Sequence, residues 1–221
     1  HGLWILNRMD TLSAERLRAV ASEADRVVRT HAMRIIAHSA NLDSMDRRVV
    51  LDGLTDPSPH VRRVASSAAA RHPHESFLEA LLALRAEIPD YDTHLLHATR
   101  ISLRNQLRQD SVLAEALART WNESRSRHLA DVMVGVYEPN AGLFLTRHLE
   151  RFSEKIDTTA QYLEHAARLV PRSELYRLVS VSEDRAADLQ EEIALFDPIR
   201  SGLAQRDLTP PRPVRARGQE L

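Results

Sequence analysis

Apolar side chains recur three and four positions apart along most of the chain, which is the spacing of one face of an α-helix. The pattern is clearest in three strings: residues 28–36, 61–68 and 95–107. Their alanines, Ala32, Ala65 and Ala98, are 33 residues apart twice in succession, and a related string at 1–5 lies 30 residues before 31–35. This recurrence predicts a repeated structural unit.

A second set of apolar helical segments lies between these strings, at residues 12–20, 45–54 and 77–84. Two helices in each unit of about 30 to 33 residues are typical of an α-solenoid, in which helix pairs stack and bury a continuous apolar seam. The predicted fold class is therefore all-α: a right-handed α-solenoid of antiparallel helix pairs with HEAT-like repeats.

Turn residues fall where this pattern needs helix ends. In the string Asp-Pro-Ser-Pro at 56–59, Ser58 is expected to cap the next helix and Pro59 to occupy its first turn. Asp25 precedes one of the other apolar strings, and Asp90 and Asp92 precede another; Asp25 is predicted to cap the first, and Asp90 or Asp92 the second.

The period weakens after residue 107, although helical patterns continue. They occupy residues 112–121, 129–137, 141–152, 160–170, 175–181 and 186–196. The sequence thus predicts one repeat domain over 1–205, with clear repeats at 1–107 and degenerate repeats at 108–205. Residues 206–221 are rich in proline and arginine and are expected to form an extended linker or tail.

Composition removes several classes of function. The 30 basic and 31 acidic residues give a net charge of −1, so no nucleic-acid partner is predicted. The absence of cysteine excludes disulfides and thiolate metal sites, and no apolar run is long enough to predict a membrane span. The chain begins with His1 rather than methionine, which indicates a segment of a longer protein.

The string 56–65 resembles a HEAT repeat of the short bacterial kind, because an Asp-Pro turn precedes Val-Arg and a buried alanine; 28–32 is the next clearest copy. A closer resemblance is to the HEAT-repeat region of large bacterial multidomain proteins that also hold a dehydrogenase-like β-propeller and a c-type haem domain. The strings that carry it are 1–4, 28–34, 92–97, 100–104, 135–136 and 143–149.

In proteins of that kind the propeller and the haem domain would carry the redox chemistry, and the repeats would join them. This chain contains no Cys-x-x-Cys-His, so no haem-binding residue is carried over and no cofactor is assigned. The resemblance implies a bacterial source and a periplasmic or cell-surface location for a haem-domain protein; otherwise the cytoplasm is expected.

Arginines supply the only candidate partner-binding residues. Those at matching positions of successive repeats are Arg29, Arg62 and Arg63, with Arg34 and Arg100 as a second matching set. Equivalent positions of a solenoid stack along one face, so these side chains would form a ladder for an acidic partner. The alternative is that they pair within the chain with Asp25, Asp56 or Asp92.

Histidine pairs are the only candidates for a metal site. His94 and His97 are three residues apart, and His72 and His74 flank a proline, but neither pair has a third ligand at a familiar spacing. These histidines are therefore interpreted as structural or solvent-exposed, and no metal is assigned. No Gly-x-Ser-x-Gly elbow is present, and no catalytic residue is assigned.

The function predicted from these patterns is a non-catalytic scaffold that contacts a protein partner or neighbouring domains of the same polypeptide. One alternative is an accessory domain that positions the propeller and cytochrome c domains of a haem-containing sugar or alcohol dehydrogenase-like protein. Another is a helical-repeat enzyme or nucleic-acid binder of the type that acts on alkylated bases. The near-zero charge and the missing catalytic constellation count against this last alternative.

Overall fold

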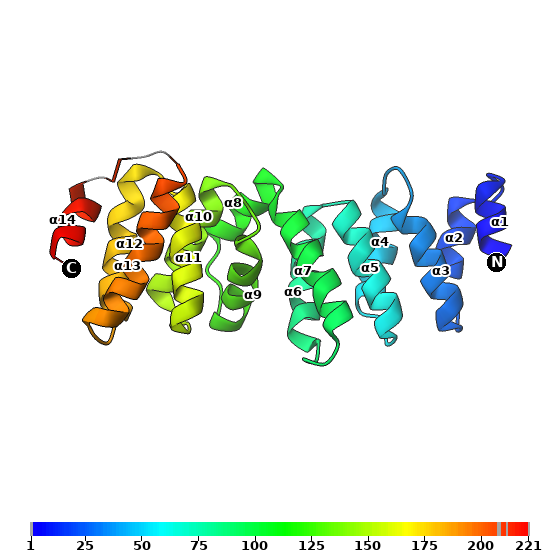
Figure 1. The fold of residues 1–221 in the computed structure, drawn as a ribbon. Coiled ribbons are helices and arrows are strands. Elements are labelled where there is room, and N and C mark those ends of the chain that lie inside the picture. The colour runs from blue at the N-terminus through cyan, green and yellow to red at the C-terminus, as the bar shows by residue number, and fades with distance from the viewer. Residues whose placement is uncertain (1, 207–208, 211, 221) are drawn as a thin grey trace. The chain divides into compact units, whose positions relative to one another are not determined.

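The computed structural model describes residues 2–206, 209–210 and 212–220, and within them the chain is helical and contains no strand (Figure 1). The helices are α1 (Gly2–Arg8), α2 (Ala14–Val20), α3 (Arg26–Ala37), α4 (Ser44–Leu54), α5 (Pro59–Arg71), α6 (Leu78–Glu87), α7 (Thr93–Leu107), α8 (Asp110–Ala118), α9 (Glu123–Met133), α10 (Pro139–Arg151), α11 (Ile156–Leu169), α12 (Leu175–Arg185), α13 (Leu189–Ala204) and α14 (Arg212–Glu220). Two 3-10 turns, η1 (Glu75–Phe77) and η2 (Arg172–Glu174), precede α6 and α12. The predicted all-α class is confirmed.

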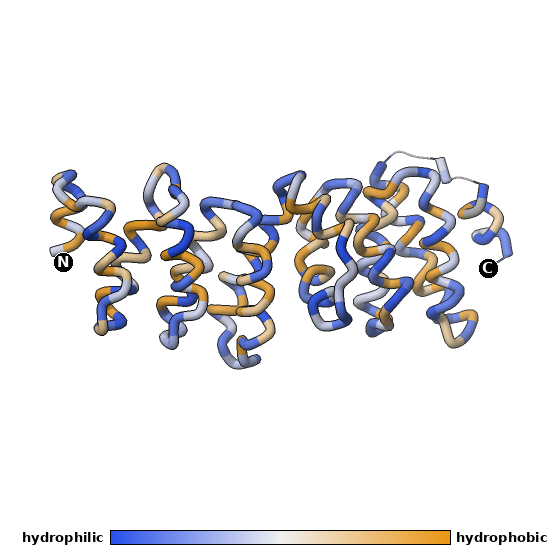
Figure 2. The backbone as a smooth tube through the Cα atoms, turned by 180° about the vertical axis from the view of Figure 1, so that it is seen from behind, coloured by the Kyte–Doolittle hydropathy of each residue, from blue (hydrophilic) through white to orange (hydrophobic). Residues whose placement is uncertain are grey.

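The segments predicted from apolar periodicity are helices in the structure. The three clearest strings lie in α3, α5 and α7, and the strings between them lie in α2, α4 and α6. The later strings correspond to α8 to α13. Apolar and polar residues are interspersed along most of these helices (Figure 2). The spacing of the apolar residues, three and four positions apart, is what allowed the sequence to locate the helices.

The chain forms two compact units, residues 1–112 (unit 1) and 113–221 (unit 2). The sequence predicts one repeat domain over residues 1–205, and this assignment stays a prediction. The division falls within α8, just after residue 107, where the 33-residue period weakens. Residue 1, which begins the predicted domain and one of the strings that carry the family resemblance, lies outside the described residues.

In unit 1, α5 packs against both α3 and α7 (Figure 1). Ala32 and Ala65 are fully buried, as predicted, and the hydroxyls of Ser66 and Thr99 lie 3.4 Å apart across α5 and α7. The prediction is one residue out of register in α7, where Ala98 is half-buried and Thr99 is fully buried. This helix therefore turns a polar residue toward α5, and the two hydroxyls satisfy each other.

In unit 2, α11 packs against α10 and α13, and α12 packs against α13 and α14. Gly202 on α13 lies so close to α11 that a Cβ at this position would meet the backbone carbonyl oxygen of Glu164 and come within 2.9 Å of the Cβ of Ala167. The missing side chain at Gly202 is thus what allows these two helices to approach.

The predicted caps are mostly confirmed. The carboxylate of Asp25 accepts a hydrogen bond from the Val27 amide at 2.7 Å, and that of Asp92 accepts one from the Leu95 amide at 3.0 Å. The prediction for Ser58 is wrong, because its side chain makes no capping hydrogen bond. Asp56, three residues before the start of α5, accepts the Ser58 amide hydrogen at 2.8 Å.

The extended conformation predicted for residues 206–221 is wrong for 212–220, which form α14. Val214 is buried, α14 packs against α12, and the Arg217 guanidinium pairs with Glu183 at 3.1 Å and with Glu192. One apolar anchor and a set of ion pairs therefore hold an arginine-rich segment as a helix. Residues 207–208, 211 and 221 of the predicted tail lie outside the described residues.

None of the helices in the described part of the chain is both long and apolar enough to cross a membrane, in agreement with the sequence prediction.

Candidate binding surface

Arg29, the first arginine of the predicted ladder, is held within unit 1. Its Nε and Nη2 donate to the two carboxylate oxygens of Asp56 at 2.8 and 3.0 Å, and its Nη1 donates to the carbonyls of Glu23 and Ala24, each at 2.8 Å. The side chains of Arg29 and Asp56 are only 14% and 10% exposed. Arg29 thus links α3 to the turn before α5. It pairs within the chain with Asp56, as the alternative to a partner-binding ladder predicts.

Asp56 is correspondingly held as a carboxylate. Burial tends to raise its pKa, but the hydrogen bonds from Arg29 and from the Ser58 amide, together with the charges of Arg29 and Arg62, outweigh burial and lower the pKa. A cavity of about 380 Å³ beside this pair is also lined by Glu23 and Asp52. Its one guanidinium faces three carboxylates, so the cavity has a net negative lining.

The other predicted arginines are distributed over three helices of unit 1. Arg62 and Arg63 lie half-buried on α5, Arg34 lies half-buried on α3, and Arg100 lies exposed on α7. Arg29 is hydrogen-bonded to Asp56, and the charge of Arg62 also lowers the pKa of that carboxylate. Partner binding by these arginines stays a prediction.

The four histidines considered as metal ligands are not brought together around a metal site among the described residues. His74 caps the turn η1. His72 Nε2 lies 3.4 Å from the carbonyl oxygen of Ala37, while His94 and His97 are exposed. No cluster of three or more histidine, aspartate or glutamate side chains suited to a metal ion occurs among residues 2–206, 209–210 and 212–220.

A more distinctive feature lies in unit 2, where α8, α9 and α10 enclose a cavity of about 390 Å³ that we call the Arg147 pocket. Its lining consists of residues 117–121 at and after the end of α8, Ser126 on α9, and Phe144, Arg147, His148, Glu150 and Arg151 on α10. Three arginines and one carboxylate therefore line it, which is the opposite balance to the cavity beside Arg29.

Two of these arginines are positioned by backbone carbonyls rather than by carboxylates. Arg147 donates to the carbonyl of Leu117 at 2.8 Å, and Arg151 donates to the carbonyl of Trp121 at 3.3 Å. The two side chains are four residues apart on α10 and so lie on one face of the helix. Helix α10 thereby holds the segment 117–121 in place while keeping both positive charges.

Arg119 completes the set. Its guanidinium lies 4.3 Å from the centre of the Trp121 ring and pairs with Glu115, one turn earlier, at 3.2 Å. Trp121 is buried and donates its indole N–H to the carbonyl of Ala116 at 2.8 Å. The tryptophan side chain thus holds the end of α8 in place, and its ring stabilises the Arg119 guanidinium through a cation–π contact.

A buried polar chain forms the floor of the pocket. His148 Nδ1 lies 2.8 Å from Ser126 Oγ, and His148 Nε2 donates to Glu154 at 3.1 Å. Burial lowers the pKa of His148 against the opposing effect of Glu154, which favours the neutral ring, and Nδ1 then accepts a hydrogen bond from the Ser126 hydroxyl. Glu154 is also bound by Arg127 at 2.6 Å.

The order serine, histidine, glutamate is that of a hydrolytic triad, but a nucleophile has to reach its substrate. Ser126 is only 4% exposed and His148 only 2%, and both ring nitrogens of His148 are engaged within the chain. The group therefore acts as a structural link between α9 and α10, which leaves the arginines as the chemically available part of the pocket.

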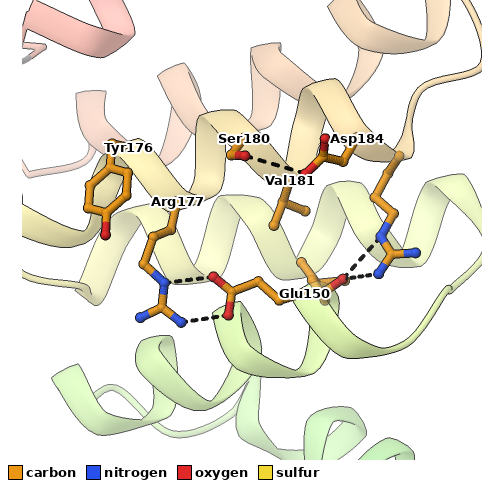
Figure 3. A pocket seen from close by; sticks show the side chains of 8 residues that line it. Glu150, Tyr176, Arg177, Ser180, Val181 and Asp184 are labelled. Carbon is orange, nitrogen blue, oxygen red and sulfur yellow. Dashed lines mark hydrogen bonds and ion pairs between the residues drawn. The ribbon is translucent and has the colours of Figure 1, made fainter.

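A second cavity, of about 400 Å³, lies next to the Arg147 pocket and shares Glu150 with it. Figure 3 shows Arg177 of α12 facing Glu150 of α10, with both nitrogen–oxygen contacts at 2.6 Å. Arg185 is bound to the carbonyl of Leu149, and Asp184 lies beside Ser180. Its two arginines are balanced by two carboxylates. Because Arg177 neutralises Glu150, the Arg147 pocket has no unpaired negative charge in its lining.

Sequence reasoning missed this pocket. The predicted ladder lies within residues 29–100, whereas Arg119, Arg147 and Arg151 lie beyond residue 107, where the 33-residue period weakens. The signal present in the sequence was the four-residue spacing of Arg147 and Arg151 on one helix face. Nothing local shows that the end of α8 folds against that face.

Comparison with known proteins identifies no relative: no family, no curated protein and no solved structure matches the chain. The resemblance to HEAT-repeat regions of multidomain haem proteins accordingly stays a prediction.

Proposed function

We propose that the chain is a non-catalytic scaffold built as a HEAT-like α-solenoid of antiparallel helix pairs, which binds a protein partner or neighbouring domains of its own polypeptide. The observation that carries this proposal is the regular packing of equivalent helices, because α5 lies between α3 and α7 with side chains in contact one repeat apart. A stack of this kind exposes a long surface for its size, which suits it to binding.

Recurring side-chain links support the same architecture in both units. The ion pairs Arg29–Asp56, Arg127–Glu154 and Glu150–Arg177 each join residues 27 positions apart. Each pair therefore connects one helix to an element that lies somewhat less than one repeat further along the chain. Ion pairs between neighbouring stacked elements are compatible with a repeat array.

Arginine-lined surfaces are the best candidates for partner contact. Arg63 and Arg100 in unit 1 belong to the predicted ladder, and Arg147 and Arg151 in unit 2 line a cavity. Arginine is enriched at protein interfaces because its planar guanidinium pairs with carboxylates while its stem packs on apolar groups. Arg29 is not in this set, because its donors are taken by Asp56 and by backbone carbonyls.

The test is affinity capture from the native source with the chain as bait, read by mass spectrometry. Three baits accompany the wild type: Arg63→Glu with Arg100→Glu, Arg147→Glu with Arg151→Glu, and a control with Arg48→Glu and Arg200→Glu, whose arginines lie in highly exposed ion pairs. A partner kept by the wild type and the control, but lost from one of the other two baits, supports the scaffold. An identical captured set for all four baits would contradict it.

A further inference from the structure

We infer that the Arg147 pocket binds an oxyanion-bearing side chain, a carboxylate or a phosphate, presented by an acidic peptide segment of a partner protein. The inference deepens the proposed scaffold function and rests on it. It assigns the contact to unit 2 and to Arg119, Arg147 and Arg151, none of which belongs to the predicted ladder.

The first argument is the donor capacity of Arg147 and Arg151. A guanidinium carries five N–H groups in a rigid fork. Arg147 uses one bond to Leu117 and Arg151 one bond to Trp121, and among the described residues neither makes an ion pair with a carboxylate. Both side chains are exposed, so their other N–H groups point to the pocket or to solvent. Two pre-positioned forks are what bidentate oxyanion recognition requires.

The second argument is charge. The pocket lining holds three arginines and one carboxylate, Glu150, which is already bound at both oxygens by Arg177. Arg119 pairs with Glu115, so the uncompensated positive charges are those of Arg147 and Arg151. His148 is neutral, because burial lowers its pKa. The cavity thus carries a local positive charge in a chain whose net charge is −1. A cavity with one sign of charge and partly apolar walls attracts the opposite charge.

The third argument is size and shape, which favour a peptide over a nucleic acid. A volume of about 390 Å³ accommodates one or two side chains rather than a run of nucleotides. Single-stranded nucleic acids also need exposed aromatic rings for stacking, whereas Trp121 is buried with Arg119 over its ring. Leu117 and Phe144 supply an apolar wall beside the arginines, which suits an acidic segment that also carries an apolar residue.

The other two cavities do not meet these conditions. The cavity around Tyr176 has two arginines balanced by Glu150 and Asp184, and the cavity beside Arg29 has an excess of carboxylates. The Arg147 pocket is the one of these three whose lining carries uncompensated positive charge.

The experiment uses the full chain and two short synthetic peptides of the same length, one rich in glutamate and leucine and one with phosphoserine in place of the central glutamate. Calorimetry measures affinity, and the fluorescence of Trp121 reports the position of the ligand in a Trp4→Phe background, because the chain has only two tryptophans. Binding by either peptide is expected to weaken with salt.

The decisive variants are Arg147→Gln and Arg151→Gln, and the matched control is Arg200→Gln, an exposed arginine of the same unit. Each pocket variant is expected to weaken binding about tenfold or more, the effect of losing a charge-assisted hydrogen bond, while the control binds like the wild type. Arg147→Lys should fall between them, because it keeps the charge and loses the fork. Circular dichroism of each variant excludes unfolding as the cause of lost binding.

The tighter of the two peptides identifies the oxyanion as carboxylate or phosphate. No binding by either peptide, or equal weakening by Arg200→Gln, overturns the inference. So does a single-stranded oligonucleotide that binds more tightly than both peptides with the same dependence on Arg147. Failure here would leave the scaffold proposal standing if affinity capture still yields a partner that depends on Arg63 and Arg100.

Discussion

The two units of the chain bury different polar groups although both are built from packed helices. Unit 1 buries Ser66, Thr99 and Gln106, whose side chains do not change charge at any physiological pH. Unit 2 buries His148 and His165, each hydrogen-bonded within the chain and each with a pKa lowered by burial. Similar helix packing is thus compatible with a core whose buried polar groups keep the same charge at every physiological pH and with a core that contains titratable histidines.

Both units pair arginines with carboxylates, but the arginines that line the cavity beside Arg29 and the Arg147 pocket differ in their partners. In unit 1, Arg18 pairs with Asp43 and Asp46, and Arg29 pairs with Asp56, so the positive charge is neutralised where it lies. In unit 2, Arg147 and Arg151 donate to backbone carbonyls. A carbonyl fixes a guanidinium without cancelling its charge, which is why unit 2 rather than unit 1 presents a positively charged cavity.

The largest expected effect comes from replacing a closely packed glycine of unit 2 with alanine, and the same type of substitution in unit 1 serves as the comparison. Gly202→Ala in unit 2 would place a methyl group against the backbone carbonyl of Glu164, which cannot move without displacing α11. We expect the free energy of unfolding to fall by about 3 kcal/mol or more, the upper range for overpacking. Urea unfolding followed by circular dichroism measures it.

The matched change in unit 1 is Gly53→Ala. The added methyl group would meet the terminal methyl of Met33, a flexible side chain, and lie 3.0 Å from the Cβ of Ala65. Repacking of Met33 and the gain of about 1 kcal/mol in helix propensity should leave the loss much smaller. An equal loss for both variants would contradict the view that backbone contact makes the α11–α13 packing special.

The next effect concerns the buried amide of unit 1. Gln106 accepts the His74 amide hydrogen at 2.7 Å and donates to the carbonyl of Ala69 at 2.8 Å. Gln106→Met keeps the shape but leaves both backbone groups without this partner, so we expect a loss of about 2 to 4 kcal/mol in the free energy of unfolding. Gln109→Met, at an exposed position two residues beyond the end of α7, should change it little. Similar losses for the two variants would rule out this role for Gln106.

A smaller loss is expected from Asp56→Asn, which removes the negative partner of Arg29. The free energy of unfolding should fall by about 1 to 2 kcal/mol, because the pair is largely buried and the hydrogen bonds are charge-assisted. Asp52→Asn is the control, since its ion pair with Arg48 is highly exposed, and such pairs contribute little. No difference between the two would show that burial does not strengthen the Arg29 pair.

The smallest effect is a dependence on pH that belongs to unit 2. An unfolded histidine gains a proton below about pH 6.5, whereas burial keeps His148 and His165 neutral in the folded chain, so stability should fall as the pH drops through that value. Hydrogen exchange at about pH 7.5 and about pH 5.5 should show the loss in residues 113–221.

The variants His148→Gln and His165→Gln should reduce this dependence on pH, and His60→Gln, at an exposed position in unit 1, should leave it unchanged. A slope that persists in the double variant, or that is larger in unit 1, would contradict the assignment to these two buried rings.

The helices themselves were predictable because their signals are local. Apolar spacing located α3, α5 and α7, and the capping carboxylates of Asp25 and Asp92 marked two of their starts. Two exceptions have different causes. Before α5, Asp56 accepts the Ser58 amide hydrogen and the Ser58 side chain makes no cap. In α14, contacts with residues far along the chain, through the buried Val214 and the ion pairs of Arg217, hold as a helix a segment that the sequence predicts to be extended.

By itself the sequence determined that this protein is all-α, where most of its helices lie and which alanines of α3 and α5 are buried, since each of these depends on residues within a few turns of one another. Only the tertiary structure decided the division into two units, the engagement of Arg29 and the positive charge of the Arg147 pocket. The physical reason is that ion pairing depends on distances between helices. Arg29 lies near a carboxylate and Arg147 near a carbonyl, and no periodicity along the chain distinguishes the two.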